Sequence, residues 1–428
     1  MYKHSIYNIV LLRNENEIII NNTLSGAIVS LPPEFLSESY PNELSEEEKN
    51  ILLSEGIIVD NRIDEFNKVI CNEHTLIWEQ DHDVAITIAP TMLCNYRCAY
   101  CFEDLNSTTF PKTTMTQQTA DSVIKSLEDR ILDLQGGKLH ITWFGGEPLL
   151  AIDLIRFISA ELIKCCKANS VEYTASIITN GLFLNKRNVR TLNKECLVSN
   201  IQITLDGSMT EYCKVKQATI SEYYTVINNI KTIPPNVRLS IRLNYDGYNM
   251  DSIKTVIREL QPYLSQPNVG IYLAEVRSYD KHREKTNKEF SEAERIFYDY
   301  IKENLPKIQY NKTSDLIPRG TYCKLIRRKN IVIDSLGNYY RCEHDIGRRD
   351  RVIGDCINGF YYNSIDTMYS SISHAPKCKT CAVFPLCLGG CPHDIFNGFQ
   401  EHIDCDTARN CIKMQAIKKY YTLININN

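Results

Sequence analysis

Apolar and polar positions alternate along this chain with a regular rhythm from residue 84 onward. Short apolar runs of strand length recur six times, and stretches with helical spacing separate them. The strand-like runs are Val84–Ala89, Leu139–Phe144, Tyr173–Thr179, Ile201–Leu205, Arg238–Asn244 and Gly270–Leu273. The helical stretches lie near 116–134, 152–168, 185–194, 222–232 and 251–264. Strands that alternate with helices predict a parallel sheet with right-handed crossovers.

Six strands are too few for a closed eight-stranded barrel. The pattern therefore favours an α/β fold of the partial (β/α)6 barrel type. In barrels of parallel strands, the active-site residues lie at the C-terminal ends of the strands. We expect the chemistry of this chain at the residues that follow each strand.

The first 80 residues predict a small α+β module instead. Strand-like runs at Ser5–Leu12 and Glu17–Ile20 are joined by a polar turn, and a short helix at Glu46–Glu55 ends at Gly56. After residue 320, turn residues and cysteines dominate until a final helix at Cys411–Leu423. We expect four parts: a module (1–80), a barrel (81–285), a bridging helix region (286–319) and a cysteine-rich domain (320–428).

Composition narrows the class of protein. The chain has 428 residues, of which 43% are hydrophobic and 23% charged, enough for a full globular core. A net charge of −4 gives no basic surface for nucleic acid. No apolar run approaches the roughly 18 residues of a membrane span, and the N-terminus lacks a signal peptide's apolar core. We expect a cytoplasmic protein with neither nucleic-acid nor membrane partners.

Seventeen cysteines change the picture, because clustered cysteines in a reducing cytoplasm hold metal or perform chemistry. Cys94, Cys98 and Cys101 follow the first barrel strand with the spacing C-x3-C-x2-C. Three thiolates can hold three irons of a 4Fe–4S cluster, which leaves the fourth iron open to a small molecule. The alternatives are chance spacing or a zinc site, although structural zinc takes four protein ligands.

This triad, with the aromatic Tyr100 before its last cysteine, resembles that of radical S-adenosylmethionine (SAM) enzymes. Further family landmarks follow at or near successive strand ends, so that the resemblance covers residues 84–280. They are Gly145, Gly146 and Glu147, then Thr179 and Asn180, then Asp206, then Arg242. The resemblance implies that these residues and Tyr100 bind SAM, with the Gly-Gly-Glu turn at its amino group. Glycines would let the backbone approach the ligand, whereas each motif alone would be an ordinary turn.

One position departs from the family. Its members often carry an arginine shortly after the Asp-Gly turn, and this chain has Lys214 and Lys216 there. Which of the two lysines, if either, makes the arginine's contact stays open at this point.

The C-terminal cysteines resemble the seven-cysteine SPASM domain, which holds two auxiliary 4Fe–4S clusters. The resemblance implies Cys323, Cys342 and Cys391 for one cluster, and Cys378, Cys381, Cys387 and a last cysteine for the other. We prefer Cys411 to Cys405 as that last ligand, because Cys411 is expected to open the terminal helix. The first cluster's fourth ligand is Cys356, Cys405, a substrate thiol or nothing. A pair of four-thiolate zinc sites is the alternative.

The resemblance implies a three-cluster enzyme in which a 5′-deoxyadenosyl radical derived from SAM abstracts hydrogen from a substrate. A reductant such as flavodoxin or ferredoxin would supply electrons. Residues 1–80 resemble the start of maturases of ribosomally made peptides, and such modules capture a leader peptide as an added strand; alternatively, they only cap the barrel. Glu343 stands where sulfatase-maturing relatives carry a catalytic aspartate, although a solvated acid is the simpler interpretation.

We therefore expect a maturase that forms a thioether or carbon–carbon cross-link in a precursor peptide. The alternative enzyme is a sulfatase-maturing one, which oxidises Cys or Ser to formylglycine. A non-catalytic peptide-binding or electron-transfer protein is a third possibility, which the intact triad and the Gly-Gly-Glu turn oppose.

Overall fold

The computed structural model describes residues 1–79, 82–103, 111–134, 136–276, 287–305, 316, 318, 320–398 and 405–426. The boundaries expected at 80/81 and 285/286 lie at or beside residues outside these ranges. The chain forms two compact units. Unit 1 comprises Met1–Glu79, Lys312–Arg327 and Ser370–Asn428, and unit 2 comprises Gln80–Asn311 and Arg328–Tyr369. The region after residue 320 thus contributes to both units.

Unit 2 contains the parallel sheet that the apolar runs predict. Its six strands are hydrogen-bonded in the order β11-β10-β9-β8-β7-β6, and each pair is parallel. They are β6 (Asp83–Ile88), β7 (Lys138–Trp143), β8 (Glu172–Thr179), β9 (Val198–Leu205), β10 (Arg238–Tyr245) and β11 (Val269–Glu275). The prediction of an α/β fold with a partial barrel is confirmed.

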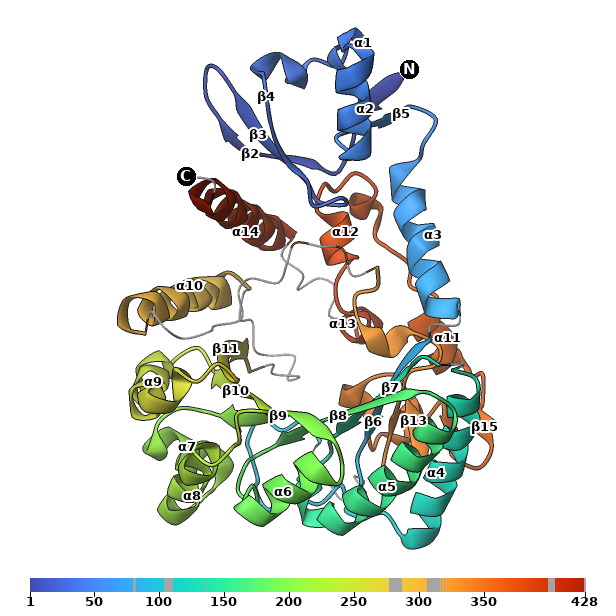
Figure 1. Ribbon diagram of the computed structural model, residues 1–428, viewed down its shortest axis with the longest axis vertical. Helices are drawn as coiled ribbons and strands as arrows, with labels where there is room; N and C mark the ends of the chain where they lie inside the picture. Colours follow the sequence, from blue (N-terminus) through green and yellow to red (C-terminus); the bar gives the residue numbers. More distant parts are fainter. Residues whose placement is uncertain are drawn as a thin grey trace. The chain divides into compact units, whose positions relative to one another are not determined.

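Helices connect these strands and line the outer side of the curved sheet (Figure 1). They are α4 (Gln117–Leu132), α5 (Ile152–Ala168), α6 (Lys186–Lys194), α7 (Met209–Lys216), α8 (Ile220–Ile230) and α9 (Met250–Leu264), followed by α10 (Asn287–Asn304). Alternate strand residues such as Leu139, Ile141 and Trp143 are fully buried in the core. The residues between them, such as His140 and Thr142, are polar and face the other side. The inner face of the sheet is therefore a polar surface.

Four short strands extend this sheet beyond β6: β12 (Ile331–Ile333), β13 (Asn338–Tyr340), β14 (Gly354–Asp355) and β15 (Gly359–Phe360). Strand β12 pairs in parallel with β6, so that Val332 lies opposite Thr87. Helix α11 (Ser364–Ser370) follows. Because β6 and β12 are neighbours, the segment that carries Cys342 and Glu343 begins beside the first barrel strand.

Unit 1 contains an antiparallel sheet of β2 (Asn8–Arg13), β3 (Ile18–Asn22) and β4 (Ile28–Leu31), in that order. A separate pair joins β1 (Tyr2–His4) and β5 (Ile58–Asp60). The run expected as one strand at Ser5–Leu12 is interrupted, because the Ser5 hydroxyl and the Ile6 N–H both donate to the carboxylate of Glu65, at 2.6 and 2.9 Å. Glu65 begins α3 (Glu65–Trp78).

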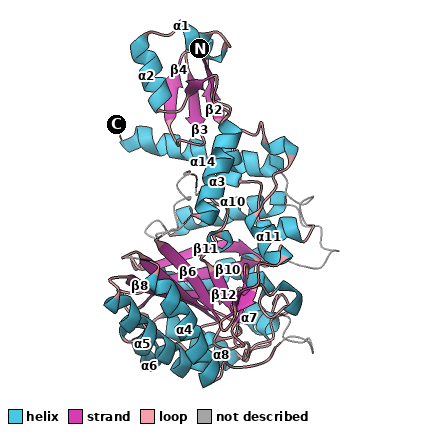
Figure 2. Ribbon diagram, turned by 90° about the vertical axis from the view of Figure 1, so that its right-hand side faces the viewer, coloured by secondary structure: helices cyan, strands magenta, loops and turns pink. Residues whose placement is uncertain are grey.

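The central strand β3 is buried on both faces. Ile18 and Ile20 pack with Leu52 of α2 (Glu46–Ser54), whereas Ile19 packs with Ala416 of α14 (Cys405–Ile426). Both helices lie next to this small sheet in Figure 2. Three short helices complete the unit: α1 (Tyr40–Glu43), α12 (Phe384–Cys387) and α13 (Pro392–Phe396). Across the described ranges, no helix has the length and apolar character needed to cross a bilayer.

Candidate functional site

The cysteine triad lies on the loop that follows β6, where the strand pattern places the active site. All three thiols are partly exposed. Burial raises the pKa of the Cys94 thiol to about 11 and that of Cys101 to about 12. Such thiols stay protonated until a cation compensates the thiolate charge, and metal binding does this. The chemistry of the three donors thus fits iron ligation.

The Gly145–Gly146 turn after β7 packs directly against the triad loop. A Cβ atom on Gly145 would lie 2.4 Å from the Thr91 carbonyl oxygen, and one on Gly146 would lie 2.2 Å from the Leu93 carbonyl oxygen. Gly145 also has a φ of +108°, which favours glycine. These glycines let two loops of the chain meet, and their expected approach to a ligand stays a prediction.

Glu147 ties this turn to the next strand end. Its carboxylate accepts hydrogen bonds from the Thr179 hydroxyl at 2.7 Å, the Asn180 N–H at 2.8 Å and the Leu149 N–H at 3.1 Å. Burial raises the pKa of Glu147, and the bonds from Asn180 and Thr179 oppose that shift. The Asn180 side chain also donates to Asn95 Oδ1 within the triad loop at 2.9 Å. Three motifs from distant parts of the sequence are thereby held together.

Asp206, after β9, forms a buried ion pair with Lys216. The Lys216 Nζ lies 3.0 Å from Asp206 Oδ2, and both side chains are nearly inaccessible to solvent. The same Nζ lies 4.0 Å from Cys98 Sγ and over the ring of Tyr212. Lys214 is instead exposed and pairs with Glu211 on its own helix. Of the two lysines, Lys216 is therefore the cation beside the triad.

Tyr100 and Arg242 also belong to this neighbourhood. Burial raises the pKa of Tyr100, as does the charge of nearby Asp206. Asn244 Nδ2 donates to Asp206 Oδ1 at 3.0 Å, and Arg242 Nε donates to Asn244 Oδ1 at 2.9 Å. The residues expected to bind SAM on the fourth and fifth strands are thus linked to one another, while their contact with SAM stays a prediction.

Glu103 is a site residue that the sequence motifs missed. Its side chain is 2% exposed, and neither carboxylate oxygen has a hydrogen-bond partner among the described residues. Burial and the nearby charge of Glu147 raise the pKa of Glu103 to about 8. A buried carboxyl without a partner is costly unless a ligand satisfies it. The available signal was its place two residues after Cys101.

Glu343 lies against the inner face of the barrel sheet. The Thr87 hydroxyl on β6 donates to Glu343 Oε1 at 3.1 Å. Burial raises the pKa of Glu343, whereas the bond from Thr87 and the charge of Arg242 lower it. The interpretation of Glu343 as a solvated surface acid is therefore not supported. A partly buried carboxyl with a raised pKa is suited to accept a proton.

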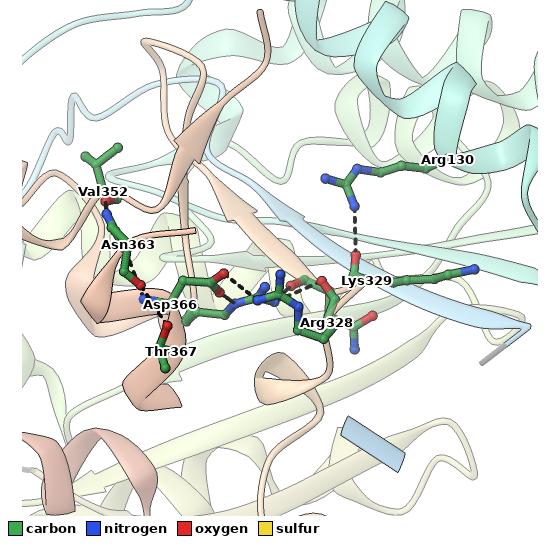
Figure 3. Close-up of polar contacts among 9 residues, drawn as sticks. Arg130, Arg328, Lys329, Val352, Asn363, Asp366 and Thr367 are labelled. Carbon is green, nitrogen blue, oxygen red and sulfur yellow. Dashed lines mark hydrogen bonds and ion pairs between the residues drawn. The ribbon is translucent and has the colours of Figure 1, made fainter. Parts of the chain in front are cut away.

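A cluster of arginines holds the segment around Cys342 in place. Arg341, which directly precedes Cys342, is fully buried and donates to Asp366 at 2.8 Å. Arg328 pairs with the other oxygen of Asp366, and Arg130 donates to the Lys329 carbonyl (Figure 3). The guanidinium groups of Arg130, Arg328 and Arg341 lie 5.0–5.2 Å from the centre of the Phe360 ring. This packing fixes the start of the Cys342–Glu343 segment.

Four other cysteines line one cavity in unit 1. The cavity has a volume of about 240 Å³, and the thiols of Cys378, Cys381, Cys387 and Cys405 line it. Lys377 hydrogen-bonds to Cys405 and Arg409 to Cys381, so two cations stand beside four potential thiolates. Within the described ranges, no three His, Cys, Asp or Glu side chains are arranged to hold a single metal ion. The donor set and its compensating charges fit a multi-iron cluster.

The reason given for preferring Cys411 is wrong. Helix α14 begins at Cys405, and Cys411 lies in its second turn. The cavity is lined by Cys405, not by Cys411. The earlier start could not be inferred, because polar residues occupy the first turn of the helix. Cys356 lies against Gly337, where a Cβ atom would be 2.5 Å from its thiol. The ligands expected for the first auxiliary cluster stay a prediction.

Comparison with known proteins agrees with this geometry. Residues 88–260 match the Radical SAM superfamily. A cysteine-type anaerobic sulfatase-maturating enzyme from Clostridium perfringens (strain 13 / Type A) is 22% identical over 369 residues, which cover 78% of this chain and 95% of that protein. Another relative, a GTP 3′,8-cyclase from Helicobacter pylori (strain HPAG1), is 29% identical over 45% of this chain and 50% of its own length.

Two solved structures share the fold. The native anSMEcpe with bound AdoMet has a TM-score of 0.59 at 16% identity and covers 81% of this chain and 100% of its own. Streptococcus suis SuiB bound to its precursor peptide SuiA has a TM-score of 0.55 at 17% identity and covers 92% of this chain and 97% of its own.

Proposed function

Because residues 88–260 form a radical SAM domain, we propose that the chain is a radical SAM maturase that cross-links a ribosomally made precursor peptide. The bond formed is a thioether or a carbon–carbon bond. The observation that carries this proposal is the small sheet of unit 1. The solved structure of SuiB bound to its precursor peptide covers 92% of this chain. The solved structure of anSMEcpe covers 81% of it.

When bound, SAM and its 4Fe–4S cluster supply the hydrogen-atom abstraction. The chain's own residues bind and orient that pair. Cys94, Cys98 and Cys101 hold the cluster, and Lys216 compensates part of its negative charge because Nζ lies 4.0 Å from Cys98 Sγ. Glu103, whose buried carboxyl has no hydrogen-bond partner among the described residues, would offer a carboxylate to the ammonium group of the methionine moiety. The strand-end residues from Thr179 to Arg242 complete the contacts.

Two auxiliary clusters are part of the proposal. The one in unit 1 would be held by Cys378, Cys381, Cys387 and Cys405, and the ligands of the other are those that the SPASM resemblance implies. Once bound, such clusters would supply an acceptor for the electron that leaves when a new bond closes. Glu343 takes the proton of the substrate group that forms this bond. Its partly buried place beside Thr87 and Arg242 supports the role, since desolvation makes a carboxylate a stronger base than one in water.

The sheet β2-β3-β4 offers an edge on which a leader peptide can add a strand. Among the described strands, β4 pairs with β3 alone. Hydrogen-bonded and non-hydrogen-bonded positions alternate along an antiparallel pair. The Asn22 N–H donates to the Ala27 carbonyl at 2.9 Å, so the amides of Ile28 and Ser30 point away from β3. These outward amides are the groups that a docked strand would use.

Deleting the whole module is a poor test, because Ile19 packs against α14 and its loss would expose an apolar surface. A single outward amide can be removed instead. Proline is tolerated on edge strands, so Ser30→Pro should weaken precursor binding while SAM cleavage continues at the wild-type rate. Ser30→Ala is the matched control, since it removes only the hydroxyl bond to Glu17. Equal precursor binding by both variants would contradict docking at β4.

The experiment that tests the function itself uses the reduced protein, SAM and each short peptide that an open reading frame next to this gene is found to encode. Mass spectrometry should show a two-hydrogen loss together with 5′-deoxyadenosine. Glu343→Gln should still release 5′-deoxyadenosine but form less cross-linked peptide, because only proton transfer is impaired. A precursor that returns unmodified from wild-type enzyme turning over SAM would contradict cross-linking.

Formylglycine formation on a sulfatase is the second candidate. It is favoured by the 22% identity to a sulfatase-maturating enzyme over 78% of this chain. A synthetic sulfatase peptide with a central cysteine distinguishes the two functions. Its conversion to an aldehyde that reacts with a hydrazide probe would support the second candidate.

A further inference from the structure

Helix α6 carries a concentrated positive charge on the outer side of the barrel sheet (Figure 1). Its sequence contains four cations and no acid, and all four cations are exposed: Lys186, Arg187, Arg190 and Lys194. None of them forms an ion pair with a residue that the structure describes. Because the whole chain has a net charge of −4, this positive surface is a local feature.

The neighbouring helices treat their cations differently. Arg156 on α5 pairs with Asp153 at 3.6 Å, and Lys214 on α7 pairs with Glu211 at 3.5 Å. On α6 the first turn contains basic residues and no acidic one. The positive end of the helix dipole disfavours cations in that turn. The charge pattern of α6 therefore opposes the stability of the helix, and we attribute it to a partner rather than to folding.

The beginning of α6 is tied to the triad loop. Asn180, directly after β8, donates from Nδ2 to Asn95 Oδ1 in the triad loop at 2.9 Å, and its Oδ1 accepts from the Leu182 N–H at 3.0 Å. Asn188 in the first turn of α6 donates to the Phe183 carbonyl at 2.8 Å. One hydrogen-bonded loop thus joins the cysteine triad to the start of the basic helix.

The triad loop itself adds a fifth cation and reaches the surface. Arg97 and Ala99 of this loop are both exposed. The Arg97 Nη1 atom donates to the carbonyls of Cys94 and Tyr96, each at 2.7 Å, and these bonds hold the guanidinium against the loop. A molecule that docks here comes close to the thiols without entering the barrel.

We propose that α6, together with Arg97, is the docking surface for the protein that reduces the cluster of the triad, and that this protein is a small acidic one-electron carrier. The inference rests on the proposed function, because SAM cleavage consumes one electron that must come from a donor. The carrier loses that electron and the cluster gains it, and no atom is transferred. Electron transfer between proteins slows steeply with distance, so the donor has to dock beside the triad loop. Complementary charge steers such an encounter and fixes its orientation.

The binding test uses the full chain and two acidic carriers as probes, a flavodoxin and a two-cluster ferredoxin. Calorimetry measures their Kd at low and at high salt. Arg187→Glu/Arg190→Glu reverses two charges of the surface. Lys125→Glu/Lys302→Glu is the matched control, because both lysines are exposed on other helices of unit 2 and the change in net charge is the same. Arg97 is left in place, since it also braces the triad loop.

At low salt, we expect the α6 variant to bind the carriers about tenfold more weakly than the wild type, and the control to stay within about twofold. The difference should shrink at high salt, because exposed charges are screened. SAM cleavage driven by 5-deazariboflavin, a small photoreductant without net charge, should be equal in all three proteins and shows that each is folded. With flavodoxin as the donor, only the α6 variant should cleave SAM more slowly.

Equal carrier binding by the two variants would overturn the inference, as would a wild type that binds neither carrier. Tighter binding of a single-stranded oligonucleotide than of both carriers, with the same dependence on Arg187 and Arg190, would assign α6 to nucleic acid and overturn it too. A photoreduced wild type that leaves SAM intact would refute the proposed function as well. Loss of the docking surface alone would leave that photoreduced activity unchanged, so the two failures are distinguishable.

Discussion

The triad loop of unit 2 and the four-cysteine cavity of unit 1 differ in the groups around their thiols. Beside the triad lie three buried carboxyls, Glu103, Glu147 and Asp206, and one buried cation, Lys216, which pairs with Asp206. Beside the four cysteines lie two cations, Lys377 and Arg409. The carboxyls of the first site include one without any partner, whereas the second site has charges that match its own thiolates.

This difference teaches which site takes a small molecule. The three thiols leave one metal position open, and the buried Glu103 carboxyl has no hydrogen-bond partner among the described residues. In the proposed function, the ammonium group of methionine would supply that partner. The four cysteines and two cations of the second site would hold an iron–sulfur core without a further ligand. We therefore propose the first site for binding and chemistry, and the second for holding electrons.

We expect the largest effect when the cysteine triad of unit 2 is removed and the other cysteines are kept. Replacing Cys94, Cys98 and Cys101 by Ala should abolish SAM cleavage, because no other thiols lie on that loop. Iron in the auxiliary sites should remain, at roughly eight of about twelve atoms if each cluster has four. Iron analysis and 5′-deoxyadenosine assays check both statements. Retained 5′-deoxyadenosine production would refute the assignment of the triad.

The second site is broken by Cys405→Ala. This variant should lose about four irons, because Cys405 lines the cavity. Cys411→Ala, in the same helix, should keep its full iron content. SAM cleavage should persist in both, since the triad is untouched. Equal iron loss by the two variants would show that Cys411 is also a ligand.

Lys216→Met tests how much the buried cation beside the triad contributes to the free energy of unfolding. It leaves Asp206 buried and unpaired, and breaking a buried ion pair costs about 3–5 kcal/mol. The exposed Lys214 provides the control, because Lys214→Met should change stability by about 0.5 kcal/mol or less. Urea unfolding of both variants measures the difference. Equal stability would mean that the Lys216–Asp206 contact of 3.0 Å contributes nothing.

Glu103→Gln has the smallest expected effect. A lost hydrogen bond between charged groups costs about 1.5–3 kcal/mol, or roughly ten- to a hundredfold in the Kd for SAM. Glu161→Gln, on the exposed face of α5, serves as the control. Calorimetry measures the Kd of each protein for SAM and for an analogue of SAM that lacks the amino group, so that the two variables form a double-mutant-type cycle. That analogue should bind the wild type and Glu103→Gln equally, and a further loss in the variant would contradict the ammonium contact.

The sequence predicted the barrel strands well, because each of the six apolar runs is long enough to show the pattern of a strand. Strands β12 to β15 were not predicted, since runs of two or three residues such as Ile331–Ile333 carry no period. The periodic runs also show where each strand ends, and this placed the motif residues at the strand ends. Their detailed contacts were not, because they depend on loops distant in sequence: Gly146 meets Leu93, and Glu147 meets Asn180.

The side chains around each cysteine set were the hardest part to predict. Lys214 and Lys216 are equivalent in sequence, and only the turn of α7 decides which one is buried. His374, on the wall of the four-cysteine cavity, contacts Glu73 from 301 positions away, and neither belongs to a motif. Such pairs arise from tertiary packing, which a local pattern does not encode.

The way the chain passes between its two units determines the order in which they can be completed during synthesis. Unit 1 begins with residue 1 but needs residues 370–428, whereas unit 2 needs nothing beyond residue 369. On the ribosome, β3 therefore waits for α14, its partner through Ile19 and Ala416, until residues 405–426 have been made. The barrel can collapse earlier. Apolar strands that wait in this way are candidates for chaperone binding, and the last cysteine of the cavity reaches the iron-loading machinery only after the whole barrel has been made.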